Sequence, residues 1–262
     1  SSLSLVLALA FSTAGAGELC TVVMDAKSKV ALHWEGNCAE RFTPASTFKV
    51  PLAVMGFDAG FLKTNVEPAL QFRPGEIDWG GEAWRQPTGP EQWMRLSVVW
   101  YSQRIVTALG QAKAQKYSQD FGFGNADLRG DPGQPSTLRP AWVSSSLQVS
   151  PLEQAQFISR LVTGELPVAP TAAEQAKALL EQHDVEGWNI RGKTGTAFPR
   201  SSGGESDETR GWGWYVGWAQ KDDRLLSFAF LTQDDQKQAS PAGIRARQRL
   251  LQKWPELVRK VQ

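Results

Sequence analysis

The sequence predicts an α+β fold: an antiparallel sheet formed by the N- and C-terminal segments, flanked by helices, with an inserted, mostly helical lobe. Three observations predict it. Strand-like patterns occupy residues 21–34 and return after residue 188. Helix-start signals lie between them. The 262 residues can bury a large core, so we expect one two-lobed domain over 17–262, with 17–45 and 185–262 in the sheet lobe and 46–184 in the helical lobe.

The expected elements follow in chain order. Strands are predicted over residues 21–25 and 29–34, and a helix carries Ser46 and bends at Pro51, which removes a backbone donor. Residues 64–90, rich in Pro, Gly and Trp, are expected to form an ordered excursion. Further helices are predicted over 104–117, from a capping box at Ser150 to residue 162, and from a capping box at Thr171 to about residue 182. Strands 188–196, 213–220 and 225–232 and a helix after Ser240-Pro241 complete the chain.

The N-terminus is typical of a truncated secretory signal. Residues 3–11 are an apolar run too short to span a bilayer, and Ala14-Gly15-Ala16 fits a cleavage site. Residues 1–16 are therefore predicted to be a signal remnant, with an N-terminal packing helix as the alternative. No other segment is predicted to cross a membrane.

Cys20 and Cys38 bracket the first predicted hairpin. In an exported protein they could pair, and closing a loop of that length contributes about 3 kcal/mol. Two free buried thiols are the alternative.

Composition excludes several kinds of chemistry. The chain has two histidines, His33 and His183, and neither belongs to a Gly-x-Ser-x-Gly elbow or a zinc-ligand motif. A Ser-His-Asp enzyme or a metal site is therefore not expected. The formal net charge is +1 with acids and bases interspersed, so nucleic acid is not an expected partner.

Ser46-Thr47-Phe48-Lys49 places a hydroxyl and an amine one helical turn apart. Serine needs a base to become a good nucleophile. An amine among apolar neighbours loses charge readily, because desolvation disfavours its charged form. Alone, the motif could equally be a helical serine beside a surface lysine.

Three later motifs support the chemical interpretation. Ser97-Val98-Val99 supplies a second serine, Phe123-Gly124-Asn125 lies in a Gly-rich run, and Lys193-Thr194-Gly195 ends a predicted strand. With these motifs in this order, the chain resembles the penicillin-recognising serine enzymes. Class A members carry Ser-Asp-Asn in the middle position. Ser97-Val98-Val99 instead resembles the form of the class D, oxacillinase-type β-lactamases. Further matching stretches are Trp142 before residues 144–147, residues 214–218 and residues 243–245.

The resemblance implies that Ser46 attacks a β-lactam carbonyl and becomes acylated. It implies that Lys49 carries CO2 as a carbamate, an N6-carboxylysine, and acts as general base. The only small molecule required beside the substrate would be CO2 or bicarbonate, with no other cofactor. Val99 would wall the pocket and Trp142 would donate its indole N–H to the carbamate, with Val143 beside them.

The remaining implied roles concern proton transfer and substrate binding. Ser97 would relay a proton towards the lactam nitrogen, and Lys193 would hold Ser97. The N–H groups of Ser46 and Thr196 would form the oxyanion hole. Thr194, beside Gly195, and Arg245 would bind the substrate carboxylate, with Arg247 and Arg249 as rivals for Arg245.

Phe123 departs from the family's usual Tyr, which is expected to affect loop packing and local hydrogen bonding but not the reaction. The resemblance also implies a periplasmic, bacterial enzyme. Two other functions remain open: a β-lactam sensor that is acylated without turnover, and a D-Ala-D-Ala peptidase. The polar segment 197–210 is expected to border the cleft. The sequence indicates no oligomeric state.

Overall fold

The computed structural model describes residues 16–134 and 139–261. The predicted signal remnant therefore lies, apart from Ala16, outside the described residues. Among the described residues, no helix combines the length and apolar character needed to span a bilayer.

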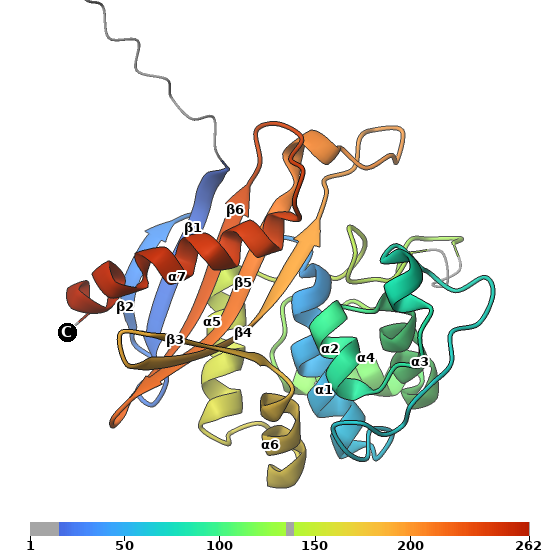
Figure 1. Ribbon diagram of the computed structural model, residues 1–262, viewed down its shortest axis with the longest axis horizontal. Helices are drawn as coiled ribbons and strands as arrows, with labels where there is room; N and C mark the ends of the chain where they lie inside the picture. Colours follow the sequence, from blue (N-terminus) through green and yellow to red (C-terminus); the bar gives the residue numbers. More distant parts are fainter. Residues whose placement is uncertain (1–15, 135–138, 262) are drawn as a thin grey trace, which may run out of the picture.

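A six-stranded antiparallel sheet forms one lobe, with strand order β2-β1-β6-β5-β4-β3. The first two strands come from the N-terminus and the other four from the C-terminal part of the chain, which confirms the predicted fold class (Figure 1). The strands are β1 Gly17–Asp25, β2 Ala31–Gly36, β3 Glu181–Val185, β4 Trp188–Ala197, β5 Trp212–Lys221 and β6 Arg224–Gln233.

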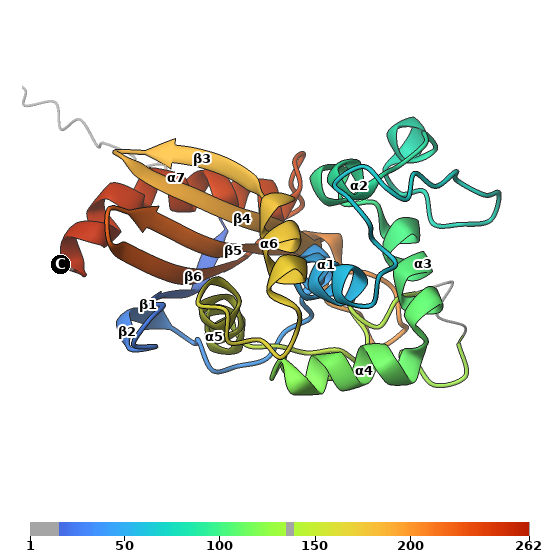
Figure 2. The ribbon, with the colours of Figure 1, turned by 90° about the horizontal axis from the view of Figure 1, so that it is seen from below.

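Helices cover both faces of the sheet. The long C-terminal helix α7 (Ala242–Lys260) crosses one face, where Leu250, Trp254 and Leu257 pack against Tyr215 and Phe228 (Figure 1). Helix α5 (Pro151–Val162) covers the other face and lies between the sheet and the helical lobe (Figure 2). The outward and inward faces of β1, β5 and β6 are both buried, so these strands read as nearly continuous apolar runs.

The second lobe is helical. It contains a short 3₁₀ helix that carries Ser46, and the largest apolar core of the described residues holds the lobe together. Its helices are η1 Ala45–Phe48, α1 Lys49–Asp58, η2 Gly81–Trp84, α2 Pro90–Leu96, α3 Val99–Leu109, α4 Gln111–Asp120 and α6 Pro170–Ala178; a further 3₁₀ helix, η3 Glu208–Arg210, precedes β5 in the sheet lobe.

Several predicted elements need correction. The helix expected over 104–117 is two helices, α3 and α4, because Gly110 between them has a φ of +79° that ends the first helix. Helix α2 was not predicted. The capping box expected at Thr171 is absent: α6 begins at Pro170, has no side-chain cap, and ends at Ala178. Residues 181–185 instead form the edge strand β3, paired with β4.

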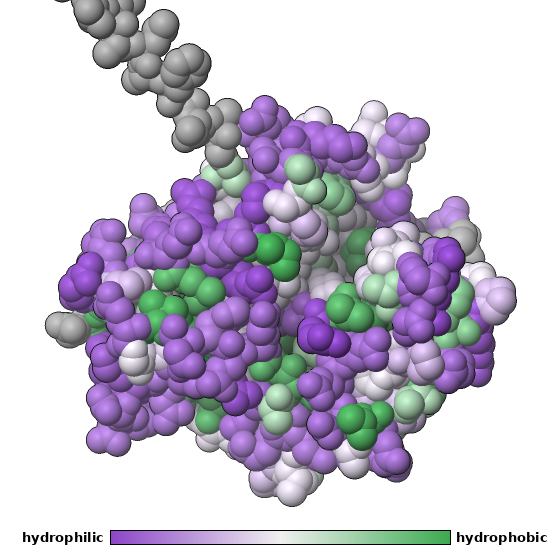
Figure 3. Space-filling view, in the orientation of Figure 1, coloured by the Kyte–Doolittle hydropathy of each residue, from purple (hydrophilic) through white to green (hydrophobic). Residues whose placement is uncertain are grey.

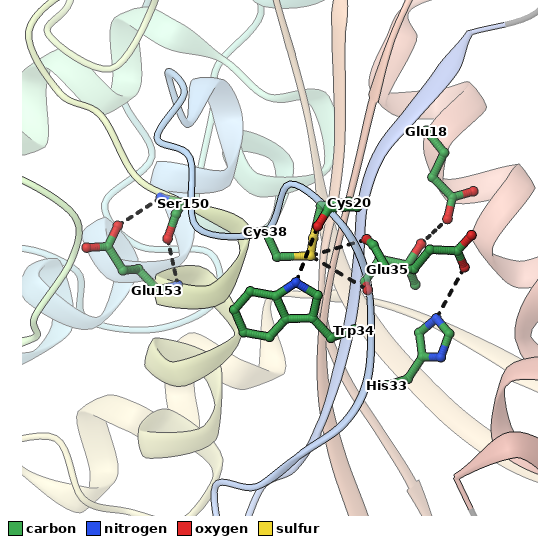
Figure 4. The surroundings of a disulfide bond; sticks show 10 residues. Glu18, Cys20, His33, Trp34, Glu35, Cys38, Ser150 and Glu153 are labelled. Carbon is green, nitrogen blue, oxygen red and sulfur yellow. Dashed lines mark hydrogen bonds and ion pairs between the residues drawn. A yellow bond between two sulfur atoms is a disulfide. The ribbon is translucent and has the colours of Figure 1, made fainter.

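Other expectations are confirmed. Ser150 accepts the N–H of Glu153, and the Glu153 carboxylate accepts the N–H of Ser150, so the predicted capping box opens α5. Cys20 and Cys38 form a disulfide, with the Trp34 indole beside it (Figure 4). The alternative of two free thiols is excluded.

Candidate active site

Ser46 lies on the 3₁₀ turn η1, and Lys49 is the first residue of α1. The two side chains face each other: the Lys49 ammonium nitrogen Nζ lies 3.4 Å from Ser46 Oγ. Pro51 falls in the first turn of α1, where a missing N–H costs little. The expected irregularity therefore lies two residues earlier, where the 3₁₀ turn gives way to α-helix.

Lys49 is one of the most buried charged side chains, at 1% exposure. Burial, together with the positive charge of Lys193, holds its pKa well below the usual value. Among the described residues Ser46 is its one hydrogen-bond partner, and no carboxylate pairs with it. The site thus contains a buried amine that favours its neutral form beside a hydroxyl.

A second serine–lysine pair faces the first. Ser97 occupies a left-handed conformation, φ 58°, at the C-terminal end of α2, just before α3 begins, and it lines the same cavity as Ser46. Lys193 of β4 donates hydrogen bonds to Ser97 Oγ at 2.5 Å and to the Thr194 carbonyl at 3.0 Å. Burial lowers the pKa of Lys193 to about 7. The negative charge of Glu181 raises this pKa, and the positive charge of Arg247 lowers it further.

Strand β4 lies directly against η1. A Cβ on Gly195 would lie 3.0 Å from the Pro44 carbonyl oxygen and 3.2 Å from the Thr47 nitrogen, tighter than most Cβ contacts, so one of the two backbones would have to shift by a few tenths of an ångström. On the other side, Thr196 Oγ1 accepts the N–H of Gly243 at 2.9 Å. Glycine at position 195 thus allows two backbones to meet where Ser46 and Thr196 were predicted to form an oxyanion hole.

Aromatic side chains build the floor near Lys49. Trp142 is buried and stacks on Phe48 at 5.3 Å between ring centroids. Its indole N–H has no hydrogen-bond partner among the described residues. Phe123 is fully buried and contacts Phe48 and, edge-on, Phe157, in keeping with the packing role expected for it.

Residues that the sequence analysis did not predict form hydrogen bonds that fix the backbone around Trp142 and Thr47. Thr43 Oγ1 donates to the Trp142 carbonyl at 2.9 Å and accepts the Ser144 N–H at 2.8 Å, and the Trp214 indole donates to the Thr43 carbonyl. Gln154 of α5 donates to Thr47 Oγ1. A sequence signal for Gln154 exists: it is a polar residue on the apolar face of a helix.

Seven of the predicted residues line one cavity of about 600 Å³, whereas Lys49, Trp142 and Lys193 do not line it, and the surface is hollowed between the two lobes (Figure 3). The excursion supplies Trp79 and Trp84, and the segment 197–210 supplies Phe198 and Glu208. Predicted residues that line the cavity are Ser46, Ser97, Val99, Val143, Thr194, Gly195 and Thr196. Another cavity, of about 440 Å³, adjoins Lys193.

Arg245 does not line this cavity. Its guanidinium binds both oxygens of the buried Asp234 carboxylate, at 2.7 and 2.6 Å, and donates to the Ser240 carbonyl. Of its rivals, Arg247 pairs with Glu181 and lines the smaller cavity, whereas Arg249 pairs with Glu18 near the start of β1.

A helical lobe and an antiparallel sheet that bring two serine–lysine pairs together define a serine acyl-transfer enzyme of the penicillin-binding type. The family model of the penicillin binding protein transpeptidase domain matches residues 19–254. Within this family, the chain belongs to the class D β-lactamases, as the following relatives show.

The chain is 38% identical over 240 residues to Beta-lactamase OXA-9 of Klebsiella pneumoniae, covering 91% of this chain and 88% of that one. It is 34% identical over 203 residues to Beta-lactamase OXA-1 of Escherichia coli, with 76% and 70% covered. The crystal structure of OXA-427, a class D β-lactamase, superposes with a TM-score of 0.85 at 42% identity, covering 93% of this chain and 99% of that one.

Proposed function

We propose that the protein hydrolyses β-lactam antibiotics through an acyl-enzyme on Ser46. One observation carries the proposal: Ser46 Oγ lies beside the buried amine of Lys49, and Ser46 lines the same cavity as Ser97, whose hydroxyl accepts a hydrogen bond from Lys193. Serine attack on an amide needs a base for the hydroxyl, a donor for the leaving nitrogen and a site for the oxyanion. The residues around this cavity can supply all three.

We propose further that Lys49 carries CO2 as a carbamate. A neutral amine forms an N–C bond to CO2 and releases a proton, and burial favours the neutral amine. Two features support this proposal: no acid among the described residues pairs with Lys49, and Val99 and Trp142, whose indole N–H lacks a partner there, belong to the same apolar core as Phe48, the neighbour of Lys49. The carbamate would supply a general base for Ser46 and later for the hydrolytic water.

The other residues act around this base. Ser97, held by Lys193, is placed to pass a proton to the lactam nitrogen. The N–H groups of Ser46 and Thr196 stabilise the developing oxyanion, one from a helix start and one from a strand. Lys193 adds positive potential near Thr194, where the substrate carboxylate binds.

Hydrolysis of a penicillin and of a chromogenic cephalosporin, with and without bicarbonate, tests the proposal. We expect turnover by the wild type and none by Ser46→Ala. Degassing at low pH should reduce activity and bicarbonate should restore it. Bicarbonate labelled with ¹³C should give a carbamate signal that Lys49→Ala loses and the exposed-lysine control Lys63→Met keeps.

Two outcomes would contradict hydrolysis. Stoichiometric acylation of Ser46 without turnover would identify a β-lactam sensor. Release of D-Ala from a pentapeptide, without β-lactam turnover, would identify a peptidase. We further propose a periplasmic location in a bacterium; secretion assays of the tagged protein would test it.

A further inference from the structure

An ion pair between Glu181 and Arg247 lies beside Lys193. Glu181 is the first residue of the edge strand β3, and Arg247, in the second turn of α7, donates a hydrogen bond to its carboxylate. Both residues and Lys193 line the small cavity of about 440 Å³. None of the three lines the main cavity that holds Ser46. The ion pair therefore approaches Lys193 from outside the cavity in which the nucleophile lies.

The pairing of β3 with β4 brings the ion pair close to Lys193. Glu181 is the register partner of Gly192, the residue that precedes Lys193 on β4. A Cβ on Gly192 would lie 2.7 Å from Cε2 of the Tyr215 ring, so this ring lies directly against the glycine. The Tyr215 hydroxyl is buried and has no hydrogen-bond partner among the described residues. Because an aromatic ring screens charges less than water does, the charge of Glu181 is felt at Lys193.

Titratable side chains from five elements lie around Lys193 and this ion pair. They are Lys49 on α1, Glu91 and Arg95 on α2, Glu181 and His183 on β3, Tyr215 on β5 and Arg247 on α7. Burial has the largest effect on the pKa of Lys193 and lowers it to about 7, whereas Glu181 raises this pKa and Arg247 lowers it. At neutral pH the ammonium and amine forms of Lys193 are therefore both populated, and a change in either neighbouring charge changes their ratio.

We propose that Glu181 and Arg247 are positioning residues that act through Lys193: together they set the fraction of Lys193 that is protonated, and so the proton that Ser97 can pass on. The inference rests on the proposed function for the reaction that uses this proton. Lys193 donates a hydrogen bond to Ser97 Oγ. As the lactam C–N bond breaks, the nitrogen takes the Ser97 proton and Lys193 replaces it, which leaves Lys193 as a neutral amine. Glu181 favours the ammonium form that starts this transfer, and Arg247 opposes it.

The test reads the charge of Lys193 directly, in the whole protein without substrate. The ¹³C signals of the lysine Cε atoms are titrated by NMR, and the Lys193 signal is assigned by its loss in Lys193→Met and Lys193→Arg. Glu181→Gln should move the Lys193 midpoint to lower pH by about half a unit, and Arg247→Gln should move it to higher pH by a similar amount, the order expected for one partly screened charge. The double variant should titrate close to wild type, and high salt should reduce both shifts.

Matched controls lie on the same two elements. Asp184→Asn on β3 and Arg259→Gln near the end of α7 each change an exposed charge and should leave the Lys193 midpoint where it is.

Kinetics then connect this charge to the reaction. The alkaline limb of kcat/KM for benzylpenicillin should move in the same two directions, because activity needs the ammonium form. A purely structural ion pair predicts the same effect whichever partner is removed, so shifts of equal sign, or no shift, overturn the inference. A kinetic limb that does not follow the NMR midpoint also overturns it. Opposite NMR shifts in a protein that turns over no β-lactam would contradict the proposed function and leave the control of the Lys193 charge standing.

Discussion

The side-chain amide of Gln154 donates a hydrogen bond of 2.8 Å to the hydroxyl of Thr47, and both side chains are buried. Thr47 in turn donates to the Pro44 carbonyl at 2.7 Å, and its methyl group lies 3.1 Å from where a Cβ of Gly195 would be. A helix packed on the sheet thus fixes the turn that presents Ser46 to β4.

This relationship predicts that Gln154→Met lowers kcat by about tenfold, because the oxyanion donors lose their spacing. Stability should fall by about 1 kcal/mol for the lost buried hydrogen bond. The exposed Gln156→Met on the same helix is the control. Thr47→Val should couple with Gln154→Met in a double-mutant cycle of stability and kcat. Additive effects would show that the bond does not set the turn.

Gly195→Ala is expected to damage catalysis strongly. The added Cβ would meet the Pro44 oxygen and the Thr47 nitrogen, both backbone atoms, so β4 must move away from η1. We expect kcat/KM to fall at least about tenfold, less than the roughly hundredfold loss that removal of a whole oxyanion donor causes. Gly203→Ala, whose Cβ would meet only the Ser201 hydroxyl oxygen at 3.7 Å, should behave as wild type. Equal kinetics in both variants would refute the close-approach argument.

Lys193 predicts a specific dependence of stability on pH. Burial lowers its pKa to about 7 in the folded protein, whereas an exposed lysine in the unfolded chain keeps the ordinary pKa of 10.5. Between these values the unfolded chain binds more protons, so this group makes the free energy of unfolding rise with pH, by up to about 1.4 kcal/mol per unit. Below pH 7 the penalty of the buried charge is fully present.

Urea unfolding at pH 7, 8 and 9 checks this slope. Lys193→Met should flatten the dependence relative to wild type and be relatively more stable near pH 7. The exposed-lysine control Lys63→Met should keep the wild-type slope. The same slope in all three proteins would mean that Lys193 titrates at its ordinary pKa.

The Cys20–Cys38 bond predicts a loss of stability without a loss of activity. The bonded cysteines are 18 residues apart, and closing such a loop contributes about 3 kcal/mol through the unfolded chain. Cys20→Ala with Cys38→Ala should lower the Tm, and reducing the wild type should do the same. Kinetics at 25 °C should stay unchanged, because neither cysteine lines the cavity. A wild-type Tm in the variant would contradict the loop argument.

Local chemistry made much of the fold predictable. Alternating apolar residues marked most of the strands, and the Ser150–Glu153 reciprocal cap marked the start of α5. Thr171 failed as a cap because Pro170 already begins the helix, and residues 181–185 pair with β4 instead of continuing it. Pairing with a distant strand overrode a local helix signal, which is the ordinary limit of local propensity.

The sequence by itself determined the chemical groups: Ser46, Lys49, Ser97 and Lys193 stand in short motifs whose spacing is local. Tertiary structure decided what those groups can do. Three features depend on segments that lie far apart in the chain. They are the burial of Lys49, the hydrogen bond of Lys193 to Ser97, and the close approach of Gly195 to η1. It also decided that Arg245 faces Asp234 while Arg95 faces the cavity, because pairing and burial depend on neighbours that residue spacing does not specify.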